Sequence, residues 1–192
     1  MNSSTSPTPA HTTKSTTMDE VVNFWSEAGP ASWFRKDEAF DADFRQRFLP
    51  AHEAAARGEL SDWSRTADGN LALLILLDQF PRNAFRGTAR MFATDADAVD
   101  VARTALVLEH DQQVAQELRN FFYLPFMHSE DLTDQNLAIE LTLPLSENAH
   151  KFAIIHRDII AQFGRFPHRN AVLGRITTPH EQAFLDSGGF AG

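Results

Sequence analysis

Residues 70–84 of this chain read NLALLILLDQFPRNA, and this stretch decides the fold class. Residues 70–79 are apolar at almost every position, so they predict a helix that is buried on all sides at the centre of a core. Proline cannot continue a helix, so Pro81 predicts that the helix ends there. Arg82 and Asn83 then follow at the point where apolar packing stops.

The end of this stretch recurs later in the chain. FPRNA at residues 80–84 is matched, with one inserted residue, by FPHRNA at residues 166–171. Each copy follows an apolar helical run and precedes a pair of arginine and glycine, Arg86-Gly87 or Gly174-Arg175. The repeat predicts two helix ends at equivalent places and one polar site, or two related ones, beside them. A repeat of this kind is also expected if a unit of one helix and one turn was duplicated and the two copies then diverged.

The rest of the chain has helical periodicity from Asp19 onward, and no stretch alternates apolar and polar residues for long enough to form a strand. The expected helices cover residues 21–25, residues 40–55 with a break or kink at Pro50 and a stop at Gly58, residues 95–107 after a cap at Thr94, residues 114–125 up to Pro125, residues 130–141 after a cap at Ser129, residues 148–163 from Asn148 up to Gly164, and a short helix from Pro179. We therefore predict an all-α fold of about eight or nine helices. Helices joined by short loops pack as a bundle or as an α-α superhelix of stacked helix pairs, and the repeat favours the superhelix.

Composition limits the class of protein. A chain of 192 residues is long enough for one domain with a real core, which we place at residues 18–192. It contains no cysteine, which excludes disulfides and thiolate metal sites. No apolar run reaches the ~20 residues of a membrane helix. The Ser- and Thr-rich residues 1–17 predict a disordered tail rather than a secretory signal. These features predict a cytoplasmic protein.

The charge of the chain argues against two kinds of partner. Its formal net charge is -9, which disfavours nucleic acids and anionic membranes. Only Lys14, Lys36 and Lys151 are lysines, so the positive charge is mostly arginine. Six arginines cluster in two stretches, residues 82–90 and 165–175. Arginine is suited to planar, bidentate pairing with a carboxylate or a phosphate.

Several motifs, in this order, resemble the family catalogued as domain of unknown function 924. They are WFxKDxxFD at 33–41, LDQFPRN at 77–83, FAxD at 92–95, PxxHSE at 125–130, FGRFPHRN at 163–170 and LGR at 173–175. The resemblance covers residues 18–185. It implies an all-helical fold similar to tetratricopeptide superhelices in bacterial cytoplasmic proteins. It implies no established activity, so no catalytic residue follows from it.

Four residues are candidates for proton chemistry: Asp78, His128, Glu130 and His156. Asp78 closes an apolar helix, so it is either a structural ion pair with Arg82 or an arginine of the second copy, or a general base beside a cavity. His156 is either a satisfied core histidine or meets His128 and Glu130 at a site. Glu130 is alternatively a first-turn acid of a helix. The spacing of these residues is not that of a metal site, so we expect no metal and no cofactor.

Seven donors beside the two copies are candidates for binding an anion: Arg82, Asn83, Arg86, Arg165, Arg169, Asn170 and Arg175. If the copies face each other, these side chains converge on one carboxylate or phosphate site. The alternative is structural pairing with helix-end carbonyls, Asp78, Asp95 or Glu130. The first hypothesis is thus a protein that binds an anionic small molecule, with enzymatic activity left open. The second is a non-enzymatic module that clamps a peptide carboxylate in a superhelical groove. The oligomeric state is not predicted.

Overall fold

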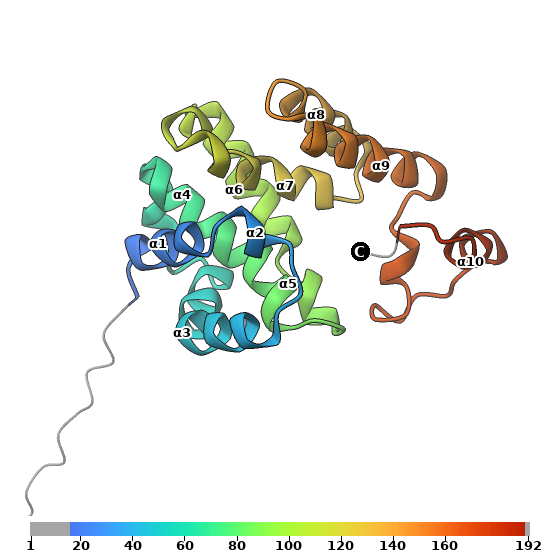
Figure 1. Ribbon diagram of the computed structural model, residues 1–192, viewed down its shortest axis with the longest axis horizontal. Coiled ribbons are helices and arrows are strands. Elements are labelled where there is room, and N and C mark those ends of the chain that lie inside the picture. The colour runs from blue at the N-terminus through green and yellow to red at the C-terminus, as the bar shows by residue number, and fades with distance from the viewer. Residues whose placement is uncertain (1–15, 191–192) are drawn as a thin grey trace, which may run out of the picture.

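The computed structural model describes residues 16–190, and these residues are helical without a strand (Figure 1). The α-helices are α1 (Met18–Ala28), α2 (Pro30–Trp33), α3 (Glu38–Ala56), α4 (Ala67–Leu74), α5 (Phe80–Ala84), α6 (Asp95–Val107), α7 (Asn120–His128), α8 (Leu132–Thr142), α9 (Glu147–Phe163) and α10 (Pro179–Asp186). A π-helical turn, Ile75–Gln79, joins α4 to α5. The described part of the chain therefore contains nine separate helices, and the all-α prediction is confirmed.

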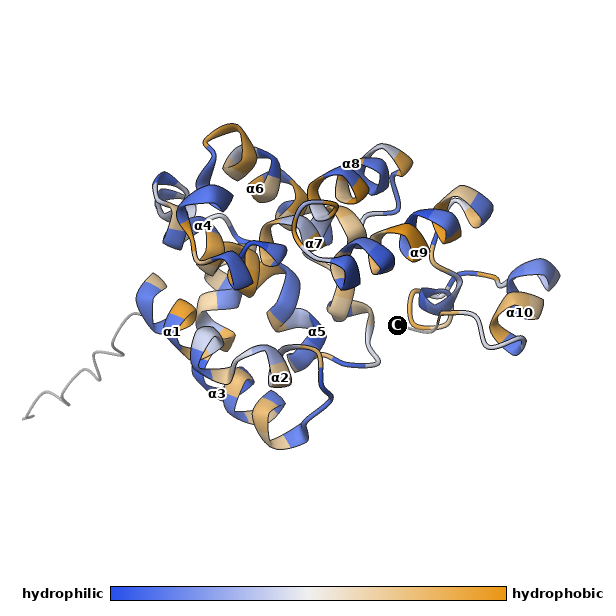
Figure 2. Cartoon of the chain, turned by 45° about the horizontal axis from the view of Figure 1, so that its top comes forward, coloured by the Kyte–Doolittle hydropathy of each residue, from blue (hydrophilic) through white to orange (hydrophobic). Residues whose placement is uncertain are grey.

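The arrangement of these helices follows the order of the chain. In Figure 1, α1 to α5 lie together at one end, α6 to α9 continue from them, and α10 lies at the far end from α1. The longer helices such as α3 and α9 carry alternating hydrophobic and hydrophilic segments, as helices with one buried face do (Figure 2). No helix within residues 16–190 is long and apolar enough to cross a membrane.

The helix predicted to end at Pro81 does not end there. Residues 70–79 are all buried, as predicted, but the chain continues through the π turn and Pro81 occupies the first turn of α5. In the π turn the Phe80 N–H donates to the carbonyl of Ile75, five residues back. A proline in an α-helix removes one hydrogen bond and crowds the carbonyl four residues earlier. The wider turn accommodates Pro81, so the two copies of the phrase are not equivalent in backbone structure.

Side chains from other elements satisfy the carbonyls that this change of helix type releases. The His52 Nδ1–H on α3 donates to the carbonyl of Leu76 at 2.9 Å, and the Thr94 hydroxyl donates to that of Leu77 at 2.5 Å. Both donors are buried. Because an unpaired buried carbonyl is costly, these contacts bind α3 and the start of α6 to the central helix.

Two other prolines also lie inside helices, where the sequence predicted a break or kink at Pro50 and a helix end at Pro125. Helix α3 continues through Pro50 without a break, and Pro50 is exposed. Pro125 lies inside α7, which ends at His128. In both helices, buried residues on either side of the proline hold the helix together. The second copy behaves as predicted, because α9 ends at Phe163 and Gly164 forms the C-cap with a positive φ of 68°.

Two expected N-caps are displaced. Ser129 is the C-cap of α7, and Asp131 caps α8 by accepting from the Thr133 N–H at 2.7 Å. Helix α9 begins at Glu147 rather than Asn148, with Ser146 as its cap. Thr94 does occupy the N-cap position of α6, and Thr178 forms a capping box at α10.

The predicted tail, residues 1–17, lies outside the described residues except for Thr16 and Thr17. Thr17 is the N-cap of α1, where it forms a capping box with Glu20. Its hydroxyl accepts from the Glu20 N–H at 3.3 Å, and the Glu20 carboxylate accepts from the Thr17 N–H at 2.9 Å. The described helical domain therefore includes Thr17.

The core forms around the central helix. Aromatic rings of α1 and α3 pack in contact, with Trp25, Phe44 and Phe80 fully buried and the Phe44 and Phe80 rings 5.1 Å apart. A second, smaller group is built on Ile159 and Phe166 near the C-terminal end. Phe80 of the first copy of the phrase belongs to the main core, and Phe166 of the second copy belongs to this smaller group.

Candidate functional site

A cavity of about 880 Å³ opens beside the end of the central helix. One part of its polar lining, the polar wall, consists of Gln79, Arg82, Asn83, Arg86, His128, His156, His168 and Arg169, and the other polar lining residues are Gln116, Glu117, Asn120, Ser146 and Asn148. Its aromatic wall consists of Trp33, Phe34, Phe92, Phe121, Phe152 and Phe190. A small number of polar groups facing apolar and aromatic walls is the usual composition of a small-molecule site, and the volume is within the usual range.

The two copies of the phrase meet at the carboxylate of Asp95, at the start of α6. Arg82 donates to both oxygens of Asp95, at 2.9 and 3.1 Å, and Arg169 donates to Oδ2 at 3.1 Å. Arg169 also donates to the carbonyl of His128 at 2.9 Å. Arg82 and Arg169 therefore converge on one carboxylate, which belongs to the protein itself. The contacts are also those of the structural alternative, because Asp95 balances both arginines.

Two phenyl rings sandwich the guanidinium of Arg169. Its central carbon lies 4.5 Å from the centroid of Phe92 and 4.4 Å from that of Phe166. Burial lowers the pKa of Arg169 to about 10, with the charge of Asp95 opposing the decrease, so the side chain remains a cation at neutral pH. Its Nε is buried without a hydrogen-bond partner among the described residues. A buried cation held in this way is rigid, since its rings fix the plane of the guanidinium.

Asp78 is the buried acid at the centre of the polar wall. It is fully buried, its Oδ1 is 3.0 Å from Arg82 and 2.7 Å from the His128 Nδ1, and its Oδ2 accepts from Gln79 at 2.6 Å. Burial alone raises the pKa of Asp78, but the positive charge of Arg82 and the contacts with His128 outweigh burial and hold the pKa well below its usual range. The predicted ion pair with Arg82 is present, and His128 is a partner that sequence did not identify.

Three histidines lie on the cavity wall. The rings of His128 and His156 are 6.4 Å apart between centroids, and the His156 Nδ1–H donates to the Phe152 carbonyl at 2.8 Å. Burial lowers the pKa values of His156 and His168 to about 4. Burial and the charge of Arg82 lower the pKa of His128 as well, against the opposing effect of Asp78. The wall is therefore lined by neutral imidazoles near pH 7.

Glu130 does not join these histidines. It lies outside the first turn of α8, where its Oε1 accepts from the Phe166 N–H at 2.9 Å and from Arg175 at 2.8 Å. Burial raises the pKa of Glu130, but the hydrogen bonds from Arg175 and the Phe166 N–H, with the charges of Arg175 and Arg169, together outweigh burial and lower it. The first-turn interpretation of Glu130 is therefore wrong, because Asp131 takes the cap position and Glu130 instead fastens the second copy of the phrase to α7.

The remaining predicted donors divide between the cavity and the C-terminal end. Asn83 and Arg86 line the cavity, and both donate to Asp41 of α3, Asn83 at 2.7 Å and Arg86 at 2.6 and 3.2 Å. The other three donors do not line the cavity. Their partners are Glu181 and the Ile176 carbonyl for Arg165, Glu130 for Arg175, and Thr177 for Asn170.

The lining residues that sequence reasoning missed include Gln79, His168 and Phe92. Gln79 and Phe92 stand within motifs already noted, LDQFPRN and FAxD, but neither type of residue by itself indicates a site. His168 is the inserted residue of the second copy, which is the signal that distinguishes it. Within residues 16–190, no group of three or more acidic or histidine side chains has the geometry to hold a metal ion.

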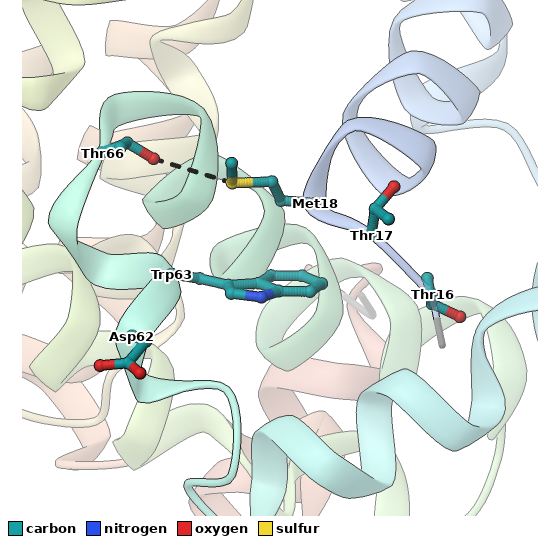
Figure 3. A pocket seen from close by; sticks show the side chains of 6 residues that line it. All are labelled: Thr16, Thr17, Met18, Asp62, Trp63 and Thr66. Carbon is teal, nitrogen blue, oxygen red and sulfur yellow. Dashed lines mark hydrogen bonds between the residues drawn. The ribbon is translucent and has the colours of Figure 1, made fainter. Parts of the chain in front are cut away.

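A smaller hollow of about 340 Å³ lies away from this site, where α1 meets the turn before α4 (Figure 3). Trp63 lies across it, and the Thr66 hydroxyl contacts the Met18 sulfur at 3.8 Å. Asp62 is its single charged side chain. This hollow lacks converging polar groups, so the larger cavity is the candidate site.

Comparison with known proteins agrees with the fold. The sequence profile of a family described as "Bacterial protein of unknown function (DUF924)" matches residues 21–189. A solved structure, that of the protein of unknown function ATU0120 from Agrobacterium tumefaciens, is similar at 53% sequence identity and a TM-score of 0.87. That match covers 89% of this chain and 97% of the other. The curated proteins contain no match.

Proposed function

We propose a function for this chain, which belongs to the DUF924 family of bacterial proteins of unknown function. It is a cytoplasmic protein that binds an anionic small molecule with an apolar part. One observation carries the proposal. Arg82, Arg86 and Arg169 line the cavity, whereas the aspartates that pair with them are not among its lining residues. Around these arginines the cavity wall therefore presents the cations first and their paired aspartates behind them, and Glu117 is the one acid among the described lining residues.

The anionic end of the ligand needs donors that the protein does not already use. The Nη1 of Arg86 makes no hydrogen bond to a described residue, and 35% of the Arg86 side chain is exposed. A carboxylate or a phosphate accepts charge-assisted hydrogen bonds from such groups. We place the anion against Arg86, because its guanidinium is the most exposed of the three and keeps its pairing with Asp41.

The apolar part of the ligand then lies along the aromatic wall. Phe34 stacks on Phe121 with centroids 6.1 Å apart and is 65% exposed, and Phe152 is 40% exposed. Exposed aromatic rings around a cavity are unfavourable in water and gain free energy when an apolar group covers them. An anion with an alkyl or aryl chain satisfies both walls.

The experiment is a titration of the protein with octanoate, hexyl phosphate and inorganic phosphate, followed by thermal unfolding and calorimetry. We expect the two amphipathic anions to raise the melting temperature with occupancy, and inorganic phosphate to act more weakly. Arg86→Gln weakens binding, whereas Arg47→Gln, a change to an exposed arginine paired with Asp43, does not. If neither octanoate nor hexyl phosphate binds, the proposal is wrong.

A peptide-binding module is the second candidate, and the two exposed rings favour it. Phe34 and Phe152 suit the side chains of an extended peptide whose terminal carboxylate reaches Arg86. This candidate keeps the proposal of a tetratricopeptide-like superhelix, since such folds bind peptides along a concave face. If the protein is such a module, a hexapeptide that ends in phenylalanine with a free carboxylate binds to it. The same peptide with a C-terminal amide does not bind.

A further inference from the structure

The tautomer of His128 follows from its partner. Asp78 is ionised and its oxygens only accept hydrogen bonds, so the contact of 2.7 Å requires that the His128 Nδ1 carries the proton. In the neutral ring the Nε2 then holds a free lone pair. No described residue hydrogen-bonds to this Nε2, and 14% of the side chain remains exposed at the cavity wall. The hydrogen bond to the buried carboxylate of Asp78 thus fixes the orientation of the His128 ring.

The charged groups around His128 keep this arrangement in place. Asp78 and Arg82 face it from the central helix, Asp95 from α6, His156 from α9, and Arg169 through the His128 carbonyl. The lowered pKa of His128 leaves the ring neutral near pH 7, when its Nε2 is able to accept a proton. A positioned neutral imidazole is the commonest general base in proteins.

The cavity offers no side-chain nucleophile to this base. Ser146 is its one hydroxyl-bearing residue among those described, and the Ser146 Oγ accepts from the Ala149 N–H as the N-cap of α9. The chain contains no cysteine. The cavity is open to solvent on one side, so water enters it. Water is therefore the nucleophile that this base activates.

We propose that the cavity is a hydrolytic site for carboxylic esters of anionic amphiphiles, in which His128 is the general base and Asp78 is its positioning residue. This inference rests on the proposed function. The Nε2 of His128 takes a proton from water as the water oxygen bonds to the ester carbonyl carbon, and the carbonyl electron pair moves to its oxygen. Arg169 lines the cavity beside His128 and contributes positive charge to this wall, while its Nη1 and Nη2 donate to Asp95 and to the His128 carbonyl.

The second half of the reaction balances the first. The oxyanion pair re-forms the carbonyl, the bond to the alcohol oxygen breaks, and the imidazolium of His128 returns its proton to that oxygen. The products are one carboxylic acid and one alcohol, and His128 is again neutral. The step needs no co-reactant other than water.

The first test measures hydrolysis of the mono-4-nitrophenyl ester of suberic acid, followed by release of nitrophenolate. We expect the parent protein to exceed His128→Gln in kcat/KM by about 100-fold or more, and His180→Gln, an exposed control on α10, to match the parent. Asp78→Asn lowers kcat and shifts the acidic limb of the pH profile. Equal rates for the parent and His128→Gln overturn the inference.

The second test is independent of turnover and of the proposed function. Nitrogen NMR of the labelled full chain at pH 7.5 reports the His128 tautomer, for which we expect Nδ1–H in the parent and a mixture in Asp78→Asn. The Nε2–H tautomer in the parent overturns the inference.

A measurement of suberate binding separates the two proposals. If suberate binds to both the parent and His128→Gln and the two hydrolyse the ester equally fast, the proposed function stands and only the hydrolytic site is wrong. Absence of suberate binding by the parent removes both.

Discussion

Arg82 and Arg169 come from the two copies of one sequence phrase and bind the same carboxylate, that of Asp95. The first lies on a continuing helix and the second in a 3-10 turn, Pro167–Arg169. Asp95 lies at the start of α6 and holds the two cations together. The convergence is therefore a property of three elements, not of a duplicated backbone unit.

This pairing predicts the effect of removing either arginine. Arg82→Gln and Arg169→Gln each break buried hydrogen bonds, so we expect each to lower the free energy of unfolding by more than ~2 kcal/mol. Arg65→Gln is the control, because Arg65 and Asp62 form a pair whose side chains are 79% and 82% exposed. Chemical denaturation in phosphate-free buffer measures all three. Changes no larger than that of the control contradict the structural role.

Asp78 connects more partners than any other acid of the site. Asp78→Ala leaves Arg82 buried without this partner, so we expect a loss of about 3–5 kcal/mol in the free energy of unfolding. Asp43→Ala, which removes an exposed partner of Arg47, is expected to cost less than about 1 kcal/mol. Urea denaturation distinguishes the two, and a small effect at Asp78 would show that its carboxylate is solvated.

The histidines of the cavity wall predict a pH dependence of stability. Their folded pKa values are lowered, to about 4 for His156 and His168, from about 6.5 in the unfolded chain. Between these values the unfolded state binds more protons, so the free energy of unfolding rises with pH and levels off above 6.5. His156→Gln reduces the slope measured between pH 4.5 and 6.5, by up to about 1.4 kcal/mol per pH unit. His180→Gln retains the slope, and an unchanged slope in His156→Gln contradicts the assignment.

Gly69 packs where no side chain fits. A Cβ at this position would lie 2.0 Å from the Trp63 carbonyl oxygen, a backbone atom that cannot turn aside. We expect Gly69→Ala to cost about 1–3 kcal/mol, even though alanine favours helices. Thermal unfolding measures the change against Asp68→Ala at the exposed neighbouring position. A gain in stability at Gly69 would mean that the turn before α4 adjusts freely.

The sequence by itself determined the helical class, the burial of residues 70–79 and the cap at Gly164. These follow from local periodicity and backbone chemistry, which act within a few residues. It also placed Asp78 beside Arg82, because four residues make one helical turn.

Tertiary structure decided the rest. It carried the chain through Pro50, Pro81 and Pro125, because buried contacts and donors from distant elements offset the hydrogen bonds that proline removes. It also placed His128 on Asp78 and separated Arg165 and Arg175 from the cavity. Those partners are far apart in sequence, and no local pattern specifies which buried charge meets which. Only the packing of helices around a shared core does so.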